Sequence, residues 1–418
     1  MIFCAGLVAC SGAKGPEPLP LPPAPGPLGW EVPPLFSAQG VLPSEWLKGA
    51  HHLVQDEVVN DGAQHHFTVT SDFGVFPATG TPMLRTRVRE SEAIAALKKA
   101  SQSDVFVEAF KFQTLNPLRG MKMLIMEPGR AGSSIGGGLL EFLSMPGRFV
   151  KTEWSDLEDS VVKSSIGFSY LKRKLAFQLK VDPYSSNAVL QDELNELSWI
   201  AFTADLIPQI GYLFVPGGAV GLTVSGTNWT SYLDEQVRDH SPGDLRALNR
   251  DRLKKMGIKE EDIHRFFLNA LYSPRHTTII TTALDDLTGV DDREAFLAAA
   301  GEANSEELVL FFQHIAEMMR GYHVQVGGVD RLLALPRIPA LYTKDQALVV
   351  MLPVDYLFWT SRVARVAQAL TSQVPSRPRV VRRELWLAGN VSPRARAELN
   401  ALGWAVHEQV LARLNPPS

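Results

Sequence analysis

Several side chains of this sequence are of the types that carry out hydrolysis, but none stands in a hydrolase motif. A serine hydrolase of the α/β type needs Gly-x-Ser-x-Gly between a strand and a helix, whereas Ser225 stands in Gly-Leu-Thr-Val-Ser-Gly. The chain also holds bases and orienting groups, among them His240, Asp244, His323, Asp355 and His407. Any chain of this length offers such a set, so these residues alone do not predict a Ser-His-Asp site.

Asp355 is the residue to which we would assign a function, if the chain has a catalytic site. It follows an apolar run and precedes a helical pattern, and ligands collect at the carboxyl ends of strands in α/β sheets. His323 and His407 are the bases that could meet it. The competing interpretation, which we favour, is that Asp355 caps the helix that follows. The sequence thus provides three catalytic candidates, which are Asp355, His323 and His407.

Two histidine pairs raise the question of a metal site. His51-His52 and His65-His66 flank a stretch with carboxylates, including Asp61, and imidazole with carboxylate can hold zinc. Adjacent residues of a strand point to opposite faces, however, so each pair could offer one ligand at most. The glycines of 129–138 lack the Lys-Ser/Thr that ends a phosphate-binding loop. We therefore predict no metal and no cofactor.

The charge of the chain bears on whether it binds nucleic acid or another anionic partner. The net charge is -4 and the pI is about 6.2, which predicts that nucleic acid is not a partner. Basic residues do cluster at Lys172-Arg173-Lys174 and at Arg377, Arg379, Arg382 and Arg383. Such clusters bind an anionic partner or form a solvated edge that prevents sheet aggregation, and we expect the edge.

The first residues are typical of a bacterial lipobox. Leu7-Val8-Ala9 precede Cys10, so the signal peptide (1–10) would be cut before a cysteine that carries a lipid anchor. A basic n-region is missing before Lys14, and we expect the initiator to lie upstream. Nine prolines follow within residues 15–34 and predict an extended spacer. The body has no cysteine, which suits an oxidising compartment. We therefore expect the chain to be exported and lipid-anchored on the periplasmic face of a bacterial membrane.

Hydrophobic periodicity divides the body into unlike parts. The 418 residues are 45% hydrophobic and 21% charged, enough for two or three domains. After a linker (11–45), residues 46–150 begin with a hairpin around 66–76. Residues 151–330 read as helices, with a Ser241 capping box. Residues 331–418 read as an α/β unit with parallel strands 383–388 and 404–407. The predicted fold class is α+β.

Residues 115–150 are unusual because they are rich in Met and Gly and low in charge. They predict short helices with adaptable packing. One hypothesis is an amphipathic segment that touches lipid or a partner. The other, which the low charge favours, is a pair of helices lying on the body.

Four segments resemble a group of uncharacterised bacterial exported proteins. These are 167–176, 181–191, 241–249 and 352–360. That resemblance implies export and no chemical activity. We therefore expect a membrane-tethered envelope lipoprotein that acts as a non-enzymatic interaction or scaffold module with an envelope protein partner. The alternatives are an envelope hydrolase with its site near Asp355 and a membrane-active protein that uses residues 115–150.

Overall fold

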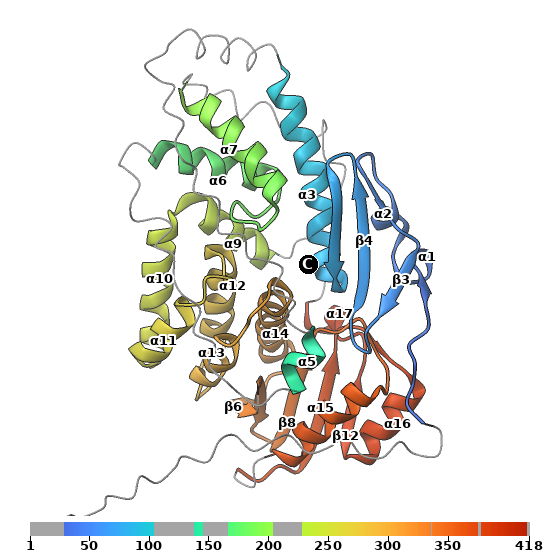
Figure 1. Ribbon diagram of the computed structural model, residues 1–418. Coiled ribbons are helices and arrows are strands. Elements are labelled where there is room, and N and C mark those ends of the chain that lie inside the picture. Colours follow the sequence, from blue (N-terminus) through green and yellow to red (C-terminus); the bar gives the residue numbers. More distant parts are fainter. Residues whose placement is uncertain are drawn as a thin grey trace, which may run out of the picture.

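The computed structural model describes residues 29–103, 138–144, 166–203, 228–335, 337–374 and 378–415. Both helices and sheets are well represented, so the fold is α+β. Figure 1 shows an N-terminal sheet in blue, a helical middle in green to brown, and a C-terminal sheet in orange and red at the bottom of the view. No described helix is long and apolar enough to cross a membrane.

An antiparallel sheet forms the N-terminal part. Its centre is β4 (His65–Ser71), which pairs with β5 (Gly74–Thr79) on one side and with β3 (Glu57–Asn60) and β2 (His52–Val54) on the other. The predicted hairpin is therefore confirmed. The linker expected to run to residue 45 is interrupted: β1 (Phe36–Ser37), α1 (Ala38–Val41) and α2 (Ser44–Leu47) already belong to the fold.

One face of this sheet is covered and the other is open. Alternate β4 residues such as Phe67 and Val69 are buried against Leu84 and Val88 of α3 (Gly80–Ser101). The residues between them on β4 point the other way and are half-buried. His65 and His66 consequently lie on opposite faces, as the strand period predicts.

The middle of the chain is helical, as expected. Its described helices are α5 (Leu139–Ser144), α6 (Ile166–Gln178), α7 (Ala188–Thr203), α9 (Asn228–Asp239), α10 (Pro242–Lys255), α11 (Glu260–Phe267), α12 (Pro274–Asp285), α13 (Glu294–Ala300) and α14 (Glu306–Gln325). The predicted capping box is confirmed: the Ser241 hydroxyl accepts from Asp244 N at 3.2 Å, and the Asp244 carboxylate accepts from Ser241 N at 3.3 Å. That carboxylate therefore has a structural role.

The C-terminal sheet has the order β12-β10-β8-β7-β6. Its strands are β6 (Val329–Leu335), β7 (Ile338–Thr343), β8 (Ala347–Leu352), β10 (Arg382–Leu387) and β12 (Trp404–His407). The short strands β9 (Tyr356–Leu357) and β11 (Asn390–Val391) pair separately. Helices α15 (Ser361–Ser372), α16 (Pro393–Ala401) and α17 (Leu411–Leu414) complete the unit. The expected parallel β-α-β arrangement of β10, α16 and β12 is confirmed.

Helices α5 and α10 to α14 share one hydrophobic core with the C-terminal sheet, whereas α6 and α7 pack with α3 in a separate cluster. The largest cluster of buried side chains runs from Leu253 through Phe312 on α14 to Trp386 and Leu414. No break in this cluster occurs near residue 330, where the sequence predicted a domain boundary. A continuous core means that these two parts stabilise each other.

Candidate functional site

The loop between β3 and β4 holds a fixed carboxylate. Asp61 Oδ1 accepts hydrogen bonds from Ala63 N and Gln64 N, each at 2.9 Å. The neighbouring Asn60 Oδ1 accepts from Gly62 N at 2.7 Å. Short polar side chains that bond the backbone two residues on are a common way to build such a turn. The turn uses one oxygen of Asp61 and leaves Oδ2 for another partner.

The same loop rests on the connection between β8 and α15. Ala63 O accepts from Asp355 N at 3.0 Å, and Gly62 O accepts from Phe358 N at 2.9 Å. Gln64 Nε2 donates to Pro353 O at 3.0 Å. Backbone bonds between segments so far apart in sequence fix the loop, and with it the Asp61 carboxylate, against the C-terminal unit.

The Asp355 carboxylate binds the backbone of the N-terminal part. Oδ2 accepts from His65 N at 2.9 Å, and Oδ1 accepts from Thr81 N at 3.1 Å in the first turn of α3. The expectation that Asp355 caps the following helix is wrong, because Thr360 caps α15 by accepting from Val363 N at 3.2 Å. Asp355 instead bonds the first turn of α3 through Thr81 N and the start of β4 through His65 N.

A hydroxyl, an imidazole and a carboxylate form a line on the open face of the sheet. His66 Nε2 lies 3.2 Å from Asp61 Oδ2, and His66 Nδ1 lies 3.4 Å from Thr79 Oγ1. Thr79 is the cross-strand partner of His66 and also the N-cap residue of α3. Its hydroxyl makes no capping hydrogen bond. The His66 side chain is 41% exposed and that of Asp61 19%, so the imidazole is accessible.

The charges in this line stabilise each other. The hydrogen bond with Asp61 raises the pKa of His66 above 6.5 despite its partial burial. Burial raises the pKa of Asp61, but hydrogen bonds with His66 and with the Gln64 and Ala63 backbone outweigh it, and the net pKa is lower than usual. Asp61 is therefore ionised and holds a proton on His66 Nε2.

A second carboxyl group lies beside Asp61. Glu307, near the start of α14, accepts from Leu139 N of α5 at 3.2 Å. A methyl group in place of the Gly138 hydrogen would lie 3.6 Å from Asp61 Oδ2 and 3.9 Å from both Glu307 oxygens. Burial raises the pKa of Glu307, and the Asp61 charge adds to this effect. Two neighbouring carboxyl groups with opposite pKa shifts are the usual basis for dividing acid and base roles.

The arrangement can perform acid–base chemistry. With its proton on Nε2, the imidazole presents Nδ1 to the Thr79 hydroxyl and can accept a proton from it or from a water. Asp61 stabilises the imidazolium that forms. Thr79 also stands at the N-terminus of a 22-residue helix, whose dipole favours negative charge there. Burial raises the pKa of Glu307, which favours its protonated form as a proton donor.

The three catalytic candidates from the sequence do not meet. His407 Nε2 lies 3.5 Å from Glu384 Oε2 and its ring tilts against Trp386. His323 stands at the end of α14, where burial lowers its pKa. No hydrogen bond or ion pair within the described part of the chain joins either histidine to Asp355. His240 bonds Gln236 O, and Ser225 lies outside the described residues.

The histidine pairs are divided between two environments. His52 is buried with Nδ1 3.0 Å from Glu92, while His51 is exposed beside Asp72 at 2.9 Å. His65 is buried against Phe36, and burial lowers its pKa. Within the described ranges, no group of three or more His, Cys, Asp or Glu side chains could hold a metal ion.

The basic clusters are largely paired within the fold. Arg382 Nη2 lies 2.9 Å from Asp345, and its Nε bonds Glu384. Arg173 is buried and donates to Arg238 O at 3.2 Å. Arg377 lies outside the described residues. The expected edge role is wrong for both residues: Arg382 lies on β10, which pairs with β12 on one side and β8 on the other, and Arg173 packs inside the helical middle.

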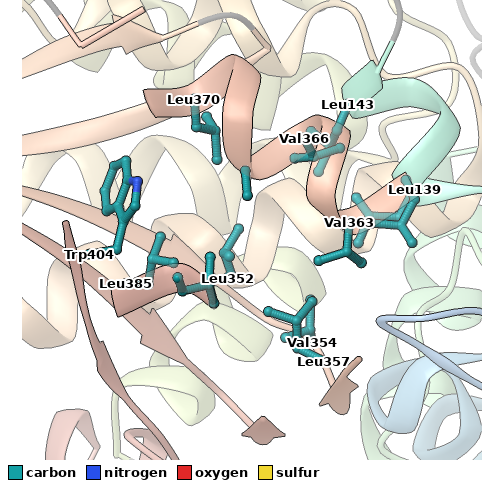
Figure 2. A pocket seen from close by; sticks show the side chains of 13 residues that line it. Leu139, Leu143, Leu352, Val354, Leu357, Val363, Val366, Leu370, Leu385 and Trp404 are labelled. Atoms are coloured by element: carbon teal, nitrogen blue, oxygen red, sulfur yellow. The ribbon is translucent and has the colours of Figure 1, made fainter. Parts of the chain in front are cut away.

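An apolar cavity lies behind α5. Its volume is about 30 Å³, enough for a water molecule in size but without polar partners for one. Figure 2 shows Leu139 and Leu143 of α5 and Val363, Val366 and Leu370 of α15 facing Leu385 and Trp404 of the sheet. The apolar side chains of α5 are thus buried, as the hypothesis of helices packed on the body predicts for 139–144. The rest of 115–150 lies outside the described residues.

Sequence reasoning missed Thr79 and Glu307. The signal for Thr79 was present, because a two-residue turn at Asp72-Phe73 sets a register that pairs His66 with Thr79. Glu307 is more than two hundred residues away and had no such signal. No protein-family model, no curated protein and no solved structure matches this chain.

Proposed function

We propose that this chain is a hydrolase of the cell envelope whose acid–base group is His66. The observation that carries the proposal is the line from Thr79 Oγ1 through the His66 ring to Asp61 Oδ2. A nucleophile or water, a base and an orienting carboxylate are the parts that acyl hydrolysis requires, and two neighbouring carboxyl groups such as Asp61 and Glu307 are those that glycosyl hydrolysis uses. The site lies against the Asp355 segment, which is where the hydrolase hypothesis from the sequence put it, but it uses other residues.

The roles follow from the pKa directions. Asp61 orients the ring and stays ionised, His66 accepts the proton of Thr79 or of water, and Glu307 donates to the leaving group. Asp355 is a positioning residue, since the hydrogen bonds that its carboxylate makes to described residues all come from backbone N–H groups. This division needs no metal or cofactor.

The test is a panel of chromogenic esters, peptide amides and aryl glycosides, assayed with purified wild type and three variants. We expect His66→Gln to lower kcat/KM about 10²- to 10⁴-fold on the class that is turned over. Asp61→Asn should lower it less, and should also move the NMR-measured pKa of His66 toward its usual value. Thr79→Val separates the two mechanisms: a large loss identifies the hydroxyl as nucleophile, and a small loss identifies water.

His51→Gln is the matched control. His51 also pairs with a carboxylate, that of Asp72, but it lies near the far end of β4 from His66, and no hydroxyl of the described residues bonds it. Its activity should equal that of wild type. Turnover that is unchanged in His66→Gln, or absent on all three substrate classes, would count against the hydrolase.

A second candidate is the interaction module expected from the sequence. It is supported by three exposed aliphatic side chains on the open face of the sheet: Leu53 is 49%, Val59 51% and Val75 60% exposed. A photo-crosslinker at position 59 should capture an envelope protein in cells, and one at Val324, 54% exposed on α14, should not. Equal capture at both positions would count against this candidate.

We also propose that Cys10 anchors the chain to the membrane. The lipobox-like residues 7–10 and the prolines of 15–34 support this proposal. The described residues begin at 29, after the lipobox and most of these prolines. Labelling with radioactive palmitate should mark the wild type and not Cys10→Ala. If neither protein is labelled, the proposed anchor is refuted, and the hydrolase proposal is unaffected.

A further inference from the structure

The cavity behind α5 is lined by apolar side chains and is not fully enclosed. Figure 2 shows Leu139 of α5 and Val366 of α15 pointing into the same space, opposite Leu385 of the sheet. Among the described side chains that line it, the one polar atom is Trp404 Nε1, which already donates to Thr371 Oγ1 at 2.8 Å. Water inside would therefore lack hydrogen-bond partners, and an apolar group is the occupant that suits this space.

The first residues of α5 connect this cavity with the proposed acid–base centre. Leu139 lines the cavity, and its backbone N–H donates to Glu307 Oε1 at 3.2 Å. Gly138 lies beside both carboxyl groups, since a methyl group there would be in ordinary van der Waals contact with Asp61 Oδ2 and with Glu307. One residue of backbone thus separates the wall of the cavity from the two carboxyl groups.

The loop between β3 and β4 contacts the wall of the cavity at two further points. A methyl group at Gly62 would lie 3.3 Å from Leu140 Cδ1, and Leu140 also lines the cavity. Ala63 O accepts from Asp355 N, and Asp355 directly follows the lining residue Val354. Ala63 itself is buried in the same hydrophobic cluster as these lining residues. A molecule bound at the two carboxyl groups therefore needs only a short chain to reach the cavity.

We propose that this cavity holds the acyl chain of the substrate, which is a short-chain carboxylic ester such as a butyryl ester. The proposal rests on the proposed hydrolase and names its substrate class. A cavity of about 30 Å³ admits a short alkyl chain and excludes a long one, and each methylene buried there should favour binding about fourfold. Hydrolysis adds water across the ester C–O bond and releases the short acid and an alcohol, so no oxidant or reductant takes part.

Binding is tested with butyramide, a neutral analogue of such an ester, by methyl NMR on the full chain. Val366 lines the cavity, and Val366→Ile fills part of it. We expect butyramide to shift the methyl signals of Leu139 and Val366 in wild type, and to bind Val366→Ile about fourfold more weakly. If Val366→Ile does not fold, Ala367→Val, at the next lining residue of α15, carries the same test.

Turnover is tested with the p-nitrophenyl esters of acetate, butyrate and octanoate. We expect kcat/KM of wild type to be about tenfold higher on butyrate than on acetate, and lower again on octanoate. Val366→Ala enlarges the cavity and should raise the octanoate-to-butyrate ratio, whereas Val366→Ile should lower the butyrate-to-acetate ratio. Val309→Ala is the matched control, because Val309 is buried on α14 in the same core but does not line the cavity. Its ratios and its affinity for butyramide should equal those of wild type.

The two readouts separate this inference from the hydrolase on which it rests. Butyramide binding that Val366→Ile weakens, without turnover of any ester, supports the cavity as an acyl-chain site and counts against the hydrolase. Turnover with the same chain-length ratios in wild type and both Val366 variants overturns the inference and leaves the hydrolase standing. The inference is also overturned if butyramide leaves the signals of Leu139 and Val366 unshifted.

Discussion

Removing the Asp355 carboxylate should destabilise the protein by about 3 kcal/mol. The loss of a helix cap at Thr81 N costs about 1 kcal/mol. The hydrogen bond from the buried His65 N–H to an ionised acceptor contributes about 1.5–3 kcal/mol. Both bonds connect residues more than 270 positions apart, so Asp355→Ala also weakens the contact between the N-terminal and C-terminal parts.

Urea unfolding followed by circular dichroism and by tryptophan fluorescence measures this effect. Agreement of the two signals is needed before a free energy is taken from the midpoints. Asp355→Asn keeps the shape of the side chain but presents an amide N–H₂ to one of the two donors. We therefore expect its loss of unfolding free energy to be more than half of the loss in Asp355→Ala. Asp251→Ala removes an exposed carboxylate of α10 and should cost nothing. A loss below about 1 kcal/mol for Asp355→Ala would refute the reasoning, since that is less than the hydrogen bond to His65 N alone should contribute.

Three further predictions follow from other contacts. The raised pKa of His66 means that the folded state holds its proton more tightly than the unfolded chain, so its contribution is complete below pH 6.5 and lost as the pH rises through the folded pKa. The difference in urea midpoint between wild type and His66→Gln should therefore shrink from about pH 5 to about pH 9; a constant difference would contradict this. A side chain at Gly389 would overlap the Asp355 carbonyl, so Gly389→Ala should cost about 1–3 kcal/mol, measured against Gly40→Ala, where a methyl group meets nothing within 4 Å. Val366→Ile places one methylene in the cavity of about 30 Å³ and should raise the free energy of unfolding by about 0.5–1 kcal/mol, whereas a loss would mean that the cavity does not admit it.

The parts of the fold that local patterns encode could be predicted from the sequence. The strand Trp404–His407 has the bounds that the sequence indicated, because Gly403 ends the preceding helix with a φ of +82°. The Ser241 box was found because Ser, Pro and Asp at fixed spacing satisfy the first N–H groups of a helix. Such signals lie within a few residues of each other and need no knowledge of the rest of the chain.

Contacts between distant segments could not be predicted in this way. The prolines around residue 30 indicated a free spacer, yet Glu31 Oε2 accepts from Trp359 N at 2.5 Å and from Ser392 Oγ at 2.6 Å. The composition of a segment predicts its stiffness, but it does not predict which surface of the fold the segment packs against. The same limit explains Glu307, which lies beside Asp61 because α14 packs against α3 and because Gly138, just before α5, lies next to both carboxyl groups.

The position of Asp355 explains how Thr79 can serve the proposed site. An N-cap threonine ordinarily accepts a hydrogen bond from the second or third residue of its helix. In α3 the third residue is Pro82, which has no N–H, and the second is Thr81, whose N–H already binds Asp355 Oδ1. The Thr79 hydroxyl is thereby left to face His66 Nδ1. If stability alone mattered, Thr79 could cap α3 without help from the C-terminal unit. A long-range carboxylate that takes over the cap is what allows a hydroxyl at a helix N-terminus to pair with an imidazole.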